Sequence, residues 1–583
     1  GNAAAIATIC RRLDGLPLAI ELAAARTSLL PPAALLKRLE RRLPLLADGP
    51  RDLPDRQQTM RETIAWSHDL LHPTERTLFA RLATFTGGAT LDAVEAVCGD
   101  EDEATGVIAG KPVFALVASL VEQSLLRAEE QADGAPRLLM LETIREYALE
   151  QLEAGPEAAA MRRRHAAWFL AIAEEAEAAL TGLEQAAWLD RLEAEHDNLR
   201  AALEWATRHG EAGLGLRLAG ALWQFWWIRG HLSEGRARLA RALTASAGPT
   251  AVRAKALDGA GALAEAQGDC DQAASLHEAA LALYRDLGDQ LGCARALQNL
   301  GIIEQHDRGN VARAGTLFVE ALALFRTVDD AQGIAAGLNN LGTIALRQRG
   351  FAQAAALFTE SLARSRALGD RRGVGIGLSS LGALAFMQED FEQAQMHYEE
   401  SLAVWRELDD IQDIAVVLGN LGEALQYRGN VARAEALYRE SLPLCEELGD
   451  KQGIAFLLSH LAQLAHGAGD EERAAALFVE SLDLCHRVGE QPRQAECLEG
   501  LAGVVAAQGD AREAVRLFSA AEVLREAVGA PRPDPFRHGY ERDLARVRAA
   551  LDQAAFAAAW EEGRQRSVAD VIANLAVAAA AGA

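Results

Sequence analysis

The chain has few of the features that build disulfide frameworks or membrane spans. Among its 583 residues only seven are cysteines, and no two of them form a CxxC pair. We therefore interpret them as small buried side chains in a reducing compartment. No apolar run approaches the roughly 18 residues that a membrane helix needs, and no charged-then-apolar signal sequence opens the chain. These absences predict a cytoplasmic protein without a membrane partner.

An excess of basic charge is also lacking. The chain carries 58 Lys and Arg against 83 Asp and Glu, which gives a formal net charge of -25. Such a surface repels phosphate backbones at long range, so we expect no direct nucleic-acid binding from this segment. The densest basic run, MRRRH at Met161–His165, is more simply interpreted as one face of an amphipathic helix than as a basic patch.

Motifs of catalysis and phosphate binding are missing as well. No GxxxxGK[ST] loop occurs, and the nearest stretch, GVIAGKPV at Gly106–Val113, has Pro112 where a magnesium-binding hydroxyl is required. Without the glycine-rich cradle and its lysine, nothing holds the β- and γ-phosphates. No HExxH, GxSxG or GxGxxG is present, and the 13 histidines show no metal-ligand spacing. The sequence thus predicts no catalytic residue, no metal ligand and no cofactor: the chain is not expected to be an enzyme.

The chain has an amino-acid composition that favours helices, and it is long enough to form several domains. Half of the residues are hydrophobic, only 5% are aromatic, and the 16 prolines lie mostly outside the second half. Ala, Leu, Glu and Arg predominate, which favours helices. We predict a folded, multi-domain, all-α protein.

Three sequence slots recur with one period in the second half. The first is a residue followed by Leu-Gly or Leu-Ala, at Asn299, Asn340, Ser380, Asn420, His460 and Gly500, spaced by 41 residues once and by 40 residues four times. The second is Gly-Asp or Gly-Asn followed by Ala, at Gly268, Gly309, Gly429, Gly469 and Gly509. The third is Glu-Ser-Leu, at Glu360, Glu400, Glu440 and Glu480. Three slots in one register identify internal repeats.

One repeat unit is predicted to be a helix hairpin. In Ile334–Asp370, apolar residues fall at three-and-four spacing in two segments separated by a turn at Gly350. Gly342 and Ala354 allow the two helices a close approach, and an apolar face is supplied by Leu341, Leu357, Phe358 and Leu362. Because one hairpin cannot bury that face alone, the units must stack into a superhelix.

The repeats resemble tetratricopeptide repeats in their 40-residue form, over about seven units. In that family the first helix of each unit lines a groove that accepts proteins, peptides or small ligands. The candidate groove residues are Asn299, Asn340, Ser380, Asn420 and His460. Their side chains could form a ladder that clamps an extended peptide backbone. Alternatively, they satisfy carbonyl groups of the adjacent loop, and both interpretations remain open.

The segment between Met161 and Ala247 holds six of the nine tryptophans. They are at positions 168, 188, 205, 223, 226 and 227. An aromatic cluster of this kind can bind a ligand, but a packed core is the simpler interpretation. We expect a helical junction between the first half of the chain and the repeats.

Stretches in the first 152 residues resemble the signal-transducing ATPases with numerous domains (STAND, NB-ARC-like), in the bacterial group of LuxR-type regulators and predicted ATPases. The stretches are Gly15–Arg26 (GLPLAIELAAAR), Arg56–Gly99, Leu116–Glu130 and Arg137–Leu152. Pro17 matches a proline that lies beside the adenine ring in the family's animal and plant members. The family's Met-His-Asp motif is matched by Met140-Leu141-Glu142, and the missing histidine puts phosphate sensing at this slot in doubt.

Local patterns in the same region are consistent with a winged helix. Helical periodicity runs through Met60–Leu71, Pro73–Phe85, Leu91–Cys98 and Val113–Gln123. SLLRAEE and PRLLMLE then predict two strands around a turn at Ala132–Gly134. Many winged helices bind DNA, but in the STAND family this domain is regulatory, and the acidic chain favours that role. In the opening stretch, we expect one helix to end at Asp14-Gly15 and the next to start at Pro17.

The fold class that follows is all-α, with a winged-helix domain followed by an α-solenoid. We expect five segments: residues 1–50, a helical remnant of the STAND nucleotide-binding module; 51–152, the winged helix; 153–250, the tryptophan-rich junction; 251–530, the repeat solenoid; and 531–583, a C-terminal helical cap. Because Gly1 falls within a helical pattern, we expect this chain to be cut from a longer protein whose nucleotide-binding core, with ATP or ADP, lies upstream.

The resemblance implies the sensor and regulatory arm of a transcriptional regulator. A partner protein, a peptide or a small-molecule effector would bind in the repeat groove and control the upstream ATPase. Two alternatives remain: a tetratricopeptide scaffold that does not switch, and the sensor arm of an N-terminal cyclase or kinase. A phosphate-binding loop upstream of Gly1 would favour a switch over a scaffold.

Overall fold

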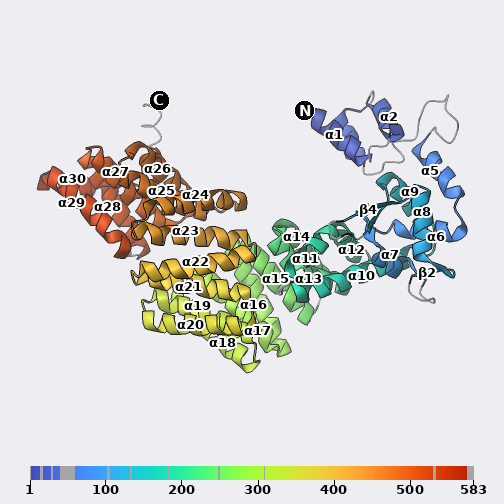
Figure 1. Cartoon of the computed structure of the whole chain (residues 1–583), viewed down its shortest axis with the longest axis horizontal. Helices are drawn as coiled ribbons and strands as arrows, with labels where there is room; N and C mark the ends of the chain where they lie inside the picture. The colour runs from blue at the N-terminus through green and yellow to red at the C-terminus, as the bar shows by residue number, and fades with distance from the viewer. Residues whose placement is uncertain are drawn as a thin grey trace. The chain divides into compact units, whose positions relative to one another are not determined.

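The computed structural model describes residues 2–13, 17–27, 30–39, 59–100, 106–131, 134, 136–180, 184–246, 248, 250–306, 309–529 and 534–573. The chain divides into two compact units, Gly1–Asn299 and Leu300–Ala583, which are taken separately below. Nearly all regular structure in the described residues is helical, as Figure 1 shows, and this confirms the predicted all-α class.

Three short helices begin the first unit. They are α1 (Asn2–Arg12), α2 (Pro17–Arg26) and α3 (Pro32–Arg38). Helix α2 begins at Pro17 as predicted, because the fixed φ of proline suits a first helical position. The expected cap at Asp14-Gly15 lies outside the described residues. Leu13, Ala19 and Leu35 are buried in the contacts of these helices.

The next segment has the helices and the strand hairpin of a winged helix. The elements are α5 (Met60–Asp69), α6 (Pro73–Leu82), β1 (Ala89–Thr90), α7 (Leu91–Cys98), β2 (Val107–Ile108), β3 (Lys111–Pro112), α8 (Val113–Glu122), β4 (Arg127–Glu130), β5 (Pro136–Leu139) and α9 (Glu142–Ala154). All four predicted helices are present, and β4 pairs with β5 in the register Glu130↔Pro136. β1 pairs with the other edge of β5, a contact that the sequence did not predict. Residues Gly106–Val113, whose sequence comes nearest to the phosphate-binding loop motif, contain the β2–β3 hairpin, in which Val107 pairs with Pro112.

Five helices form the junction that follows. They are α10 (Ala158–Ala179), α11 (Gln185–Ala194), α12 (His196–Arg208), α13 (Ala212–Ile228) and α14 (Leu232–Ala245). The MRRRH run lies in α10 but covers more than the one face predicted for it: Met161 and His165 are buried, while the Arg163 side chain is 66% exposed. The tryptophans do not form one core. Trp226 is buried, Trp227 is 40% exposed, and the other four are half-buried.

The repeats are seven consecutive helix pairs followed by two further helices. The pairs are α15 (Ala251–Ala266) with α16 (Cys270–Leu287), α17 (Gln290–His306) with α18 (Val311–Thr327), α19 (Ala331–Arg347) with α20 (Phe351–Leu368), α21 (Arg371–Met387) with α22 (Phe391–Glu407), α23 (Ile411–Tyr427) with α24 (Val431–Leu448), α25 (Lys451–Gly467) with α26 (Glu471–Val488), and α27 (Gln491–Ala507) with α28 (Ala511–Val528). Helices α29 (Asp534–Ala550) and α30 (Gln553–Arg564) pack on α27 and α28. Within the second unit, Figure 1 shows the pairs α19–α28 stacked in chain order.

In the four pairs from α17 to α24, a glycine in the first helix lies against an aromatic ring of the second helix. A Cβ atom added at Gly342 would come within 2.5 Å of the Phe358 ring, and one at Gly422 within 2.6 Å of the Tyr438 ring. Phe358 and Tyr438 are both buried. The predicted close approach at Gly342 is therefore confirmed, because no larger side chain fits there without moving the ring.

The Glu-Ser-Leu slot joins the two helices of a pair. The serine of each copy is buried and donates a hydrogen bond to a backbone carbonyl 26 residues earlier, in the first helix: Ser361 to Ala335 (2.7 Å), Ser401 to Gly375 (2.9 Å), Ser441 to Ala415 (2.8 Å) and Ser481 to Ala455 (2.7 Å). This repeated bond explains why the slot holds serine rather than an apolar residue.

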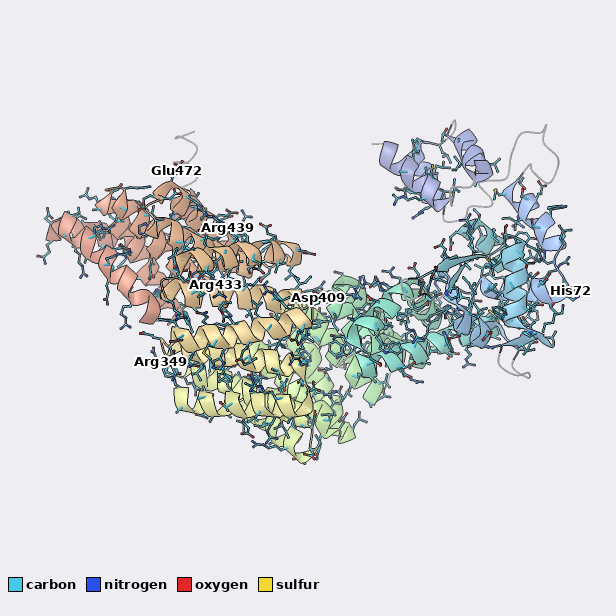
Figure 2. All side chains as sticks on the ribbon, in the orientation of Figure 1. His72, Arg349, Asp409, Arg433, Arg439 and Glu472 are labelled. Carbon is cyan, nitrogen blue, oxygen red and sulfur yellow. The ribbon has the colours of Figure 1, made fainter. Side chains whose placement is uncertain are left out.

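The turns between helices use left-handed residues and side-chain caps. Gly369, Gly449 and Gly489 end second helices at positive φ, and aspartates such as Asp370 then accept a hydrogen bond from the first turn of the next helix. In some turns the left-handed residue is not a glycine. Asp409 (φ 53°) takes the left-handed conformation at the α22–α23 turn, and Arg349 (φ 60°) takes it at the α19–α20 turn (Figure 2).

Candidate functional sites

A buried ion pair fastens the winged helix to the junction helices. Arg137, on β5, lies with its Nη1 atom 2.8 Å from Oε1 of Glu195, between α11 and α12. The two side chains are only 8% and 5% exposed. The guanidinium also donates to the carbonyls of Gly87 (2.9 Å) and Ala194 (2.8 Å). An ion pair removed from water is stable only with such additional hydrogen bonds.

Asn198 completes this network from the first turn of α12. Its Oδ1 atom accepts from the backbone N–H of Thr86 (2.8 Å), and its Nδ2 atom donates to the carbonyl of Gly88 (2.9 Å) and to Glu195 (2.7 Å). The Nε2 atom of His165 lies 3.2 Å from the same Oδ1. Burial lowers the pKa of His165 to about 4, so the ring is neutral at pH 7 and Nε2–H donates to the amide oxygen.

A second buried arginine links α6 to the start of α10. The Arg81 guanidinium lies 2.8 Å from Glu157 and 2.6 Å from Asp100, and it also donates to the carbonyl of Cys98 (2.6 Å). Hydrogen bonds to these carboxylates raise the pKa of Arg81 despite its burial. The winged helix and the junction are thus joined by two paired arginines.

The nucleotide-contact residues implied by the STAND resemblance are only partly described. Leu141 is half-buried and is the N-cap residue of α9, and Glu142 pairs with Arg145 at 2.8 Å. Pro17 begins α2, but its side chain lies outside the described residues. Contact of Pro17 with adenine therefore stays a prediction.

In the second unit, the first helices of consecutive pairs present a face of mixed apolar and polar side chains. We call Asn340, Ser380 and Asn420, with Ile376 and Val416, the A-helix face. Ile376 and Ser380 are four residues apart on α21, as are Val416 and Asn420 on α23, so each pair shares one side of its helix. Ile376 is 41% exposed and Val416 49%.

The polar residues of the A-helix face have unused hydrogen-bonding capacity. Asn340, Ser380 and Asn420 are half-buried. Among the side-chain hydrogen bonds that join described residues, none involves any of the three, so neither the ladder nor the loop-carbonyl interpretation is decided. Their amide and hydroxyl groups can meet a ligand's backbone.

The other two candidate residues are engaged with neighbours. Asn299, at the end of the first unit, donates to Oδ1 of Asp258 (3.3 Å), which also lies 2.6 Å from Nδ1 of His277. His460 is only 1% exposed and lies with its Nδ1 atom 3.2 Å from Oε1 of Gln426. Its ring stacks on Tyr438 at 5.3 Å. His460 can therefore act on a ligand only through the residues around it.

Next to Asn420 lies a set of ionisable groups that sequence reasoning missed. We call Glu423, Gln426, His460, Arg493 and Glu496, from α23, α25 and α27, the Glu423 cluster. Burial raises the pKa of Glu423 to about 8, so its carboxyl is largely protonated at neutral pH. Burial lowers the pKa of His460 to about 3. Burial also raises the pKa of Glu496, although Arg493 at 3.3 Å opposes it.

The cluster combines donors and acceptors close to an aromatic surface. The side chain of Glu423 is 13% exposed, and that of Arg493 is 18% exposed, with its guanidinium 4.8 Å from the centre of the Phe456 ring. A protonated carboxyl beside a guanidinium offers hydrogen-bond donors to carbonyl or carboxylate groups. Neither Glu423 nor Arg493 belongs to a repeat slot, because the equivalent positions in other repeats hold different residues. The only sequence signal for these two residues was a charged side chain at a position beside the A-helix face.

Comparison with known families agrees with the order of domains along the chain. A tetratricopeptide repeat model matches overlapping windows, namely residues 252–327, 293–367, 333–407, 374–447, 413–485 and 453–527. The rear helices are tetratricopeptide repeats. A winged helix-turn-helix domain model matches residues 71–153. The predicted winged helix followed by a tetratricopeptide solenoid is thus confirmed.

Two similar proteins come from mycobacteria. One from Mycobacterium bovis and one from Mycobacterium tuberculosis, each named "Putative HTH-type transcriptional regulator", are 39% identical over 310 residues, which is 52% of this chain and 34% of the relative. This chain therefore spans about a third of the length of these relatives.

One solved structure is similar to this chain in fold. It is the crystal structure of a Signal Transduction ATPase with Numerous Domains (STAND) protein with a tetratricopeptide repeat sensor from Pyrococcus horikoshii, with a TM-score of 0.53 and 13% identity, over 92% of this chain and 74% of that chain. The likeness concerns the fold alone. In the described part of the chain, no helix combines the length and apolarity needed to span a bilayer.

Proposed function

We propose that this chain is the sensor and regulatory arm of a STAND-type transcriptional regulator. A protein or peptide binds the A-helix face, and the winged helix transmits the change to a nucleotide-binding module elsewhere in the full-length protein. The chain itself acts in the cytoplasm without a catalytic centre, and ATP or ADP belongs to that module. The mycobacterial relatives' names support a role in transcription.

The observation that carries the binding part is the composition of the A-helix face. Ile376 and Val416 expose large apolar side chains, which a soluble surface normally keeps scattered, and these two occupy equivalent positions 40 residues apart. The uncommitted groups of Ser380 and Asn420 lie one turn away on the same helices. Apolar anchors beside backbone-binding amides suit an extended peptide segment.

The regulatory part is supported by the buried network at Arg137. Because Arg137, Glu195 and Asn198 connect β5 to α11–α12 through buried hydrogen bonds, a movement of the junction moves the winged helix with it. Such a switch requires that the partner bind one arrangement better than the other.

The test places a photo-crosslinking residue at Val416 or at Ile376 in the full-length protein. Met396, on α22, is 48% exposed and serves as the matched control outside the A-helix face. We expect one cross-linked partner from cell extract at the first two positions, absent at Met396 and lost when Asn420 is changed to Asp. Equal labelling at all three positions would contradict the proposal.

A non-switching scaffold is the second candidate, and Leu141 favours it. An apolar side chain in the slot of the family's phosphate-sensing histidine removes one route by which a winged helix responds to nucleotide. A scaffold would cross-link the same partner, but partner binding would leave nucleotide exchange in the full-length protein unchanged.

A further inference from the structure

His196, at the start of α12 in the first unit, is a buried histidine whose ring makes no hydrogen bond to any described residue. The whole residue His196 is only 6% exposed. The Nδ1 atom lies 3.8 Å from Oε1 of Glu193, and the Nε2 atom lies 3.6 Å from Oε2 of Glu234, both beyond hydrogen-bond distance. Nε2 is buried with no partner among the described residues. Since buried polar atoms are nearly always paired, the His196 ring is not held by hydrogen bonds in this arrangement and is open to a further interaction.

Two further donor groups lie beside this ring. His231, directly before α14, has its Nε2 atom 3.1 Å from one carboxylate oxygen of Glu193 and 3.3 Å from the other. The rings of His196 and His231 have their centres 4.5 Å apart. One donor atom from each of Glu193, His196 and His231 lies within 4.8 Å of the other two. Bonds of about 2.0–2.2 Å to a tetrahedral ion place donor atoms roughly 3.3–3.5 Å apart, so the 3.1 Å and 3.8 Å contacts of Glu193 fit an ion and the two rings would have to draw together around it.

We propose that Glu193, His196 and His231 bind a divalent transition-metal ion of the zinc class. Two imidazoles and one carboxylate form a donor set that suits zinc, cobalt or nickel rather than magnesium or calcium, which prefer oxygen ligands alone. Three protein ligands leave one position for water or for a ligand from a partner. The Glu193 side chain is 44% exposed, so the ion can enter from solvent.

Glu234 supplies the outer partner that a metal-binding histidine requires. With Nδ1 bound to the ion, the proton of His196 resides on Nε2, 3.6 Å from Oε2 of Glu234, and a small movement of the ring towards Glu234 would let Nε2–H donate to it. That carboxylate is fixed by Arg200, whose Nε atom donates to it at 2.8 Å.

Sequence spacing did not reveal this site, because His231 is 35 residues from His196. Only the packing of α14 against α12 brings the three donors together. A hydrogen bond between His231 and Glu193 would explain those two residues without an ion, but it leaves Nε2 of His196 without a hydrogen-bond partner among the described residues. Glu195, which pairs with Arg137, lies between two of the proposed ligands, so the metal site and the winged-helix contact share one turn.

The test is calorimetric titration of the full chain, freed of metal by a chelator, with Zn²⁺ alone and then with Co²⁺, whose absorption reports tetrahedral binding. We expect one saturable site at micromolar or lower concentration. Glu193→Gln and His231→Gln should each weaken binding at least tenfold, while the nearby controls Glu184→Gln and His209→Gln should not change it. Zn²⁺ should also slow amide exchange in α11 and α12.

Because the seven cysteines can also bind Zn²⁺, the variants decide the outcome. Binding of unchanged affinity in both Glu193→Gln and His231→Gln would overturn the proposal, as would the absence of saturable binding. Circular dichroism of each variant verifies that it is folded, and Glu193→Gln is a conservative change at a partly exposed position.

Discussion

Arg137 of the winged helix and Glu195 of the junction form an ion pair at 2.8 Å in which neither side chain is more than 8% exposed. We expect Arg137→Met to destabilise the first unit by about 3–5 kcal/mol, because it leaves the Glu195 carboxylate buried without its counter-ion. Urea unfolding followed by tryptophan fluorescence measures the loss.

The matched control is Arg217→Met, in an exposed pair. Arg217 contacts Glu174 at 2.8 Å with both side chains about half exposed, so its loss should cost less than about 1 kcal/mol. Similar costs for the two variants would show that the Arg137 network does not fasten the winged helix.

Gly422→Ala should loosen one repeat. The added methyl group would lie 2.6 Å from the Tyr438 ring, and such overpacking costs about 1–3 kcal/mol. Hydrogen exchange should show the amides of α23 and α24 losing protection about tenfold for each 1.4 kcal/mol. Gly467→Ala, where no atom lies within 4 Å of the new Cβ, should leave protection unchanged or higher. Equal effects at both glycines would contradict the packing account.

Asp409→Gly should stabilise the α22–α23 turn. Asp409 has φ 53°, a conformation that costs a residue with a side chain on the order of 1–3 kcal/mol and that glycine adopts freely. The reverse change, Gly449→Asp at the next equivalent turn (φ 67°), should lower the melting temperature. A melting temperature that falls in Asp409→Gly would mean that the aspartate makes a compensating contact.

Glu423 should make stability depend on pH. Its pKa is raised by burial from 4.5 to about 8, so between these values the folded state holds a proton that the unfolded state has released. Stability therefore falls as pH rises through this window, by at most about 1.4 kcal/mol per pH unit. Glu423→Gln mimics the protonated form and should be neutral at pH 5 but stabilising by roughly 1–3 kcal/mol at pH 8.5, since partial solvation reduces the cost.

The control for this pH dependence is Glu440→Gln, in an exposed pair with Arg406. It should give nearly the same small change at pH 5 and pH 8.5. If Glu423→Gln also behaves identically at the two pH values, the Glu423 carboxyl is ionised in the folded state.

Most of the fold could be predicted from the sequence because its signals are local and repeated. The slot with Gly342 predicted a close helix approach, and α2 begins at Pro17 because a proline ring fixes φ there. The pairing of β1 with β5 could not be predicted, since a two-residue strand has no periodicity of its own.

The candidate sites were less accessible to sequence reasoning. A shared slot does not impose a shared environment: the Asn420 side chain makes no hydrogen bond to a described residue, while His460 in the next repeat is buried against Tyr438. The partners of Arg137 and Glu423 lie on other helices, and only the packed fold determines which charges meet.

Nucleotide exchange in the full-length protein tests the central claim most directly. The rate is measured with and without the partner identified at Val416, in the intact protein and in a variant lacking the repeats from Ala251 onward. The account predicts that the partner changes the rate at least severalfold in the intact protein, that Val416→Glu abolishes this change, and that removal of the repeats makes the rate independent of the partner. Identical exchange rates in all of these samples would contradict it.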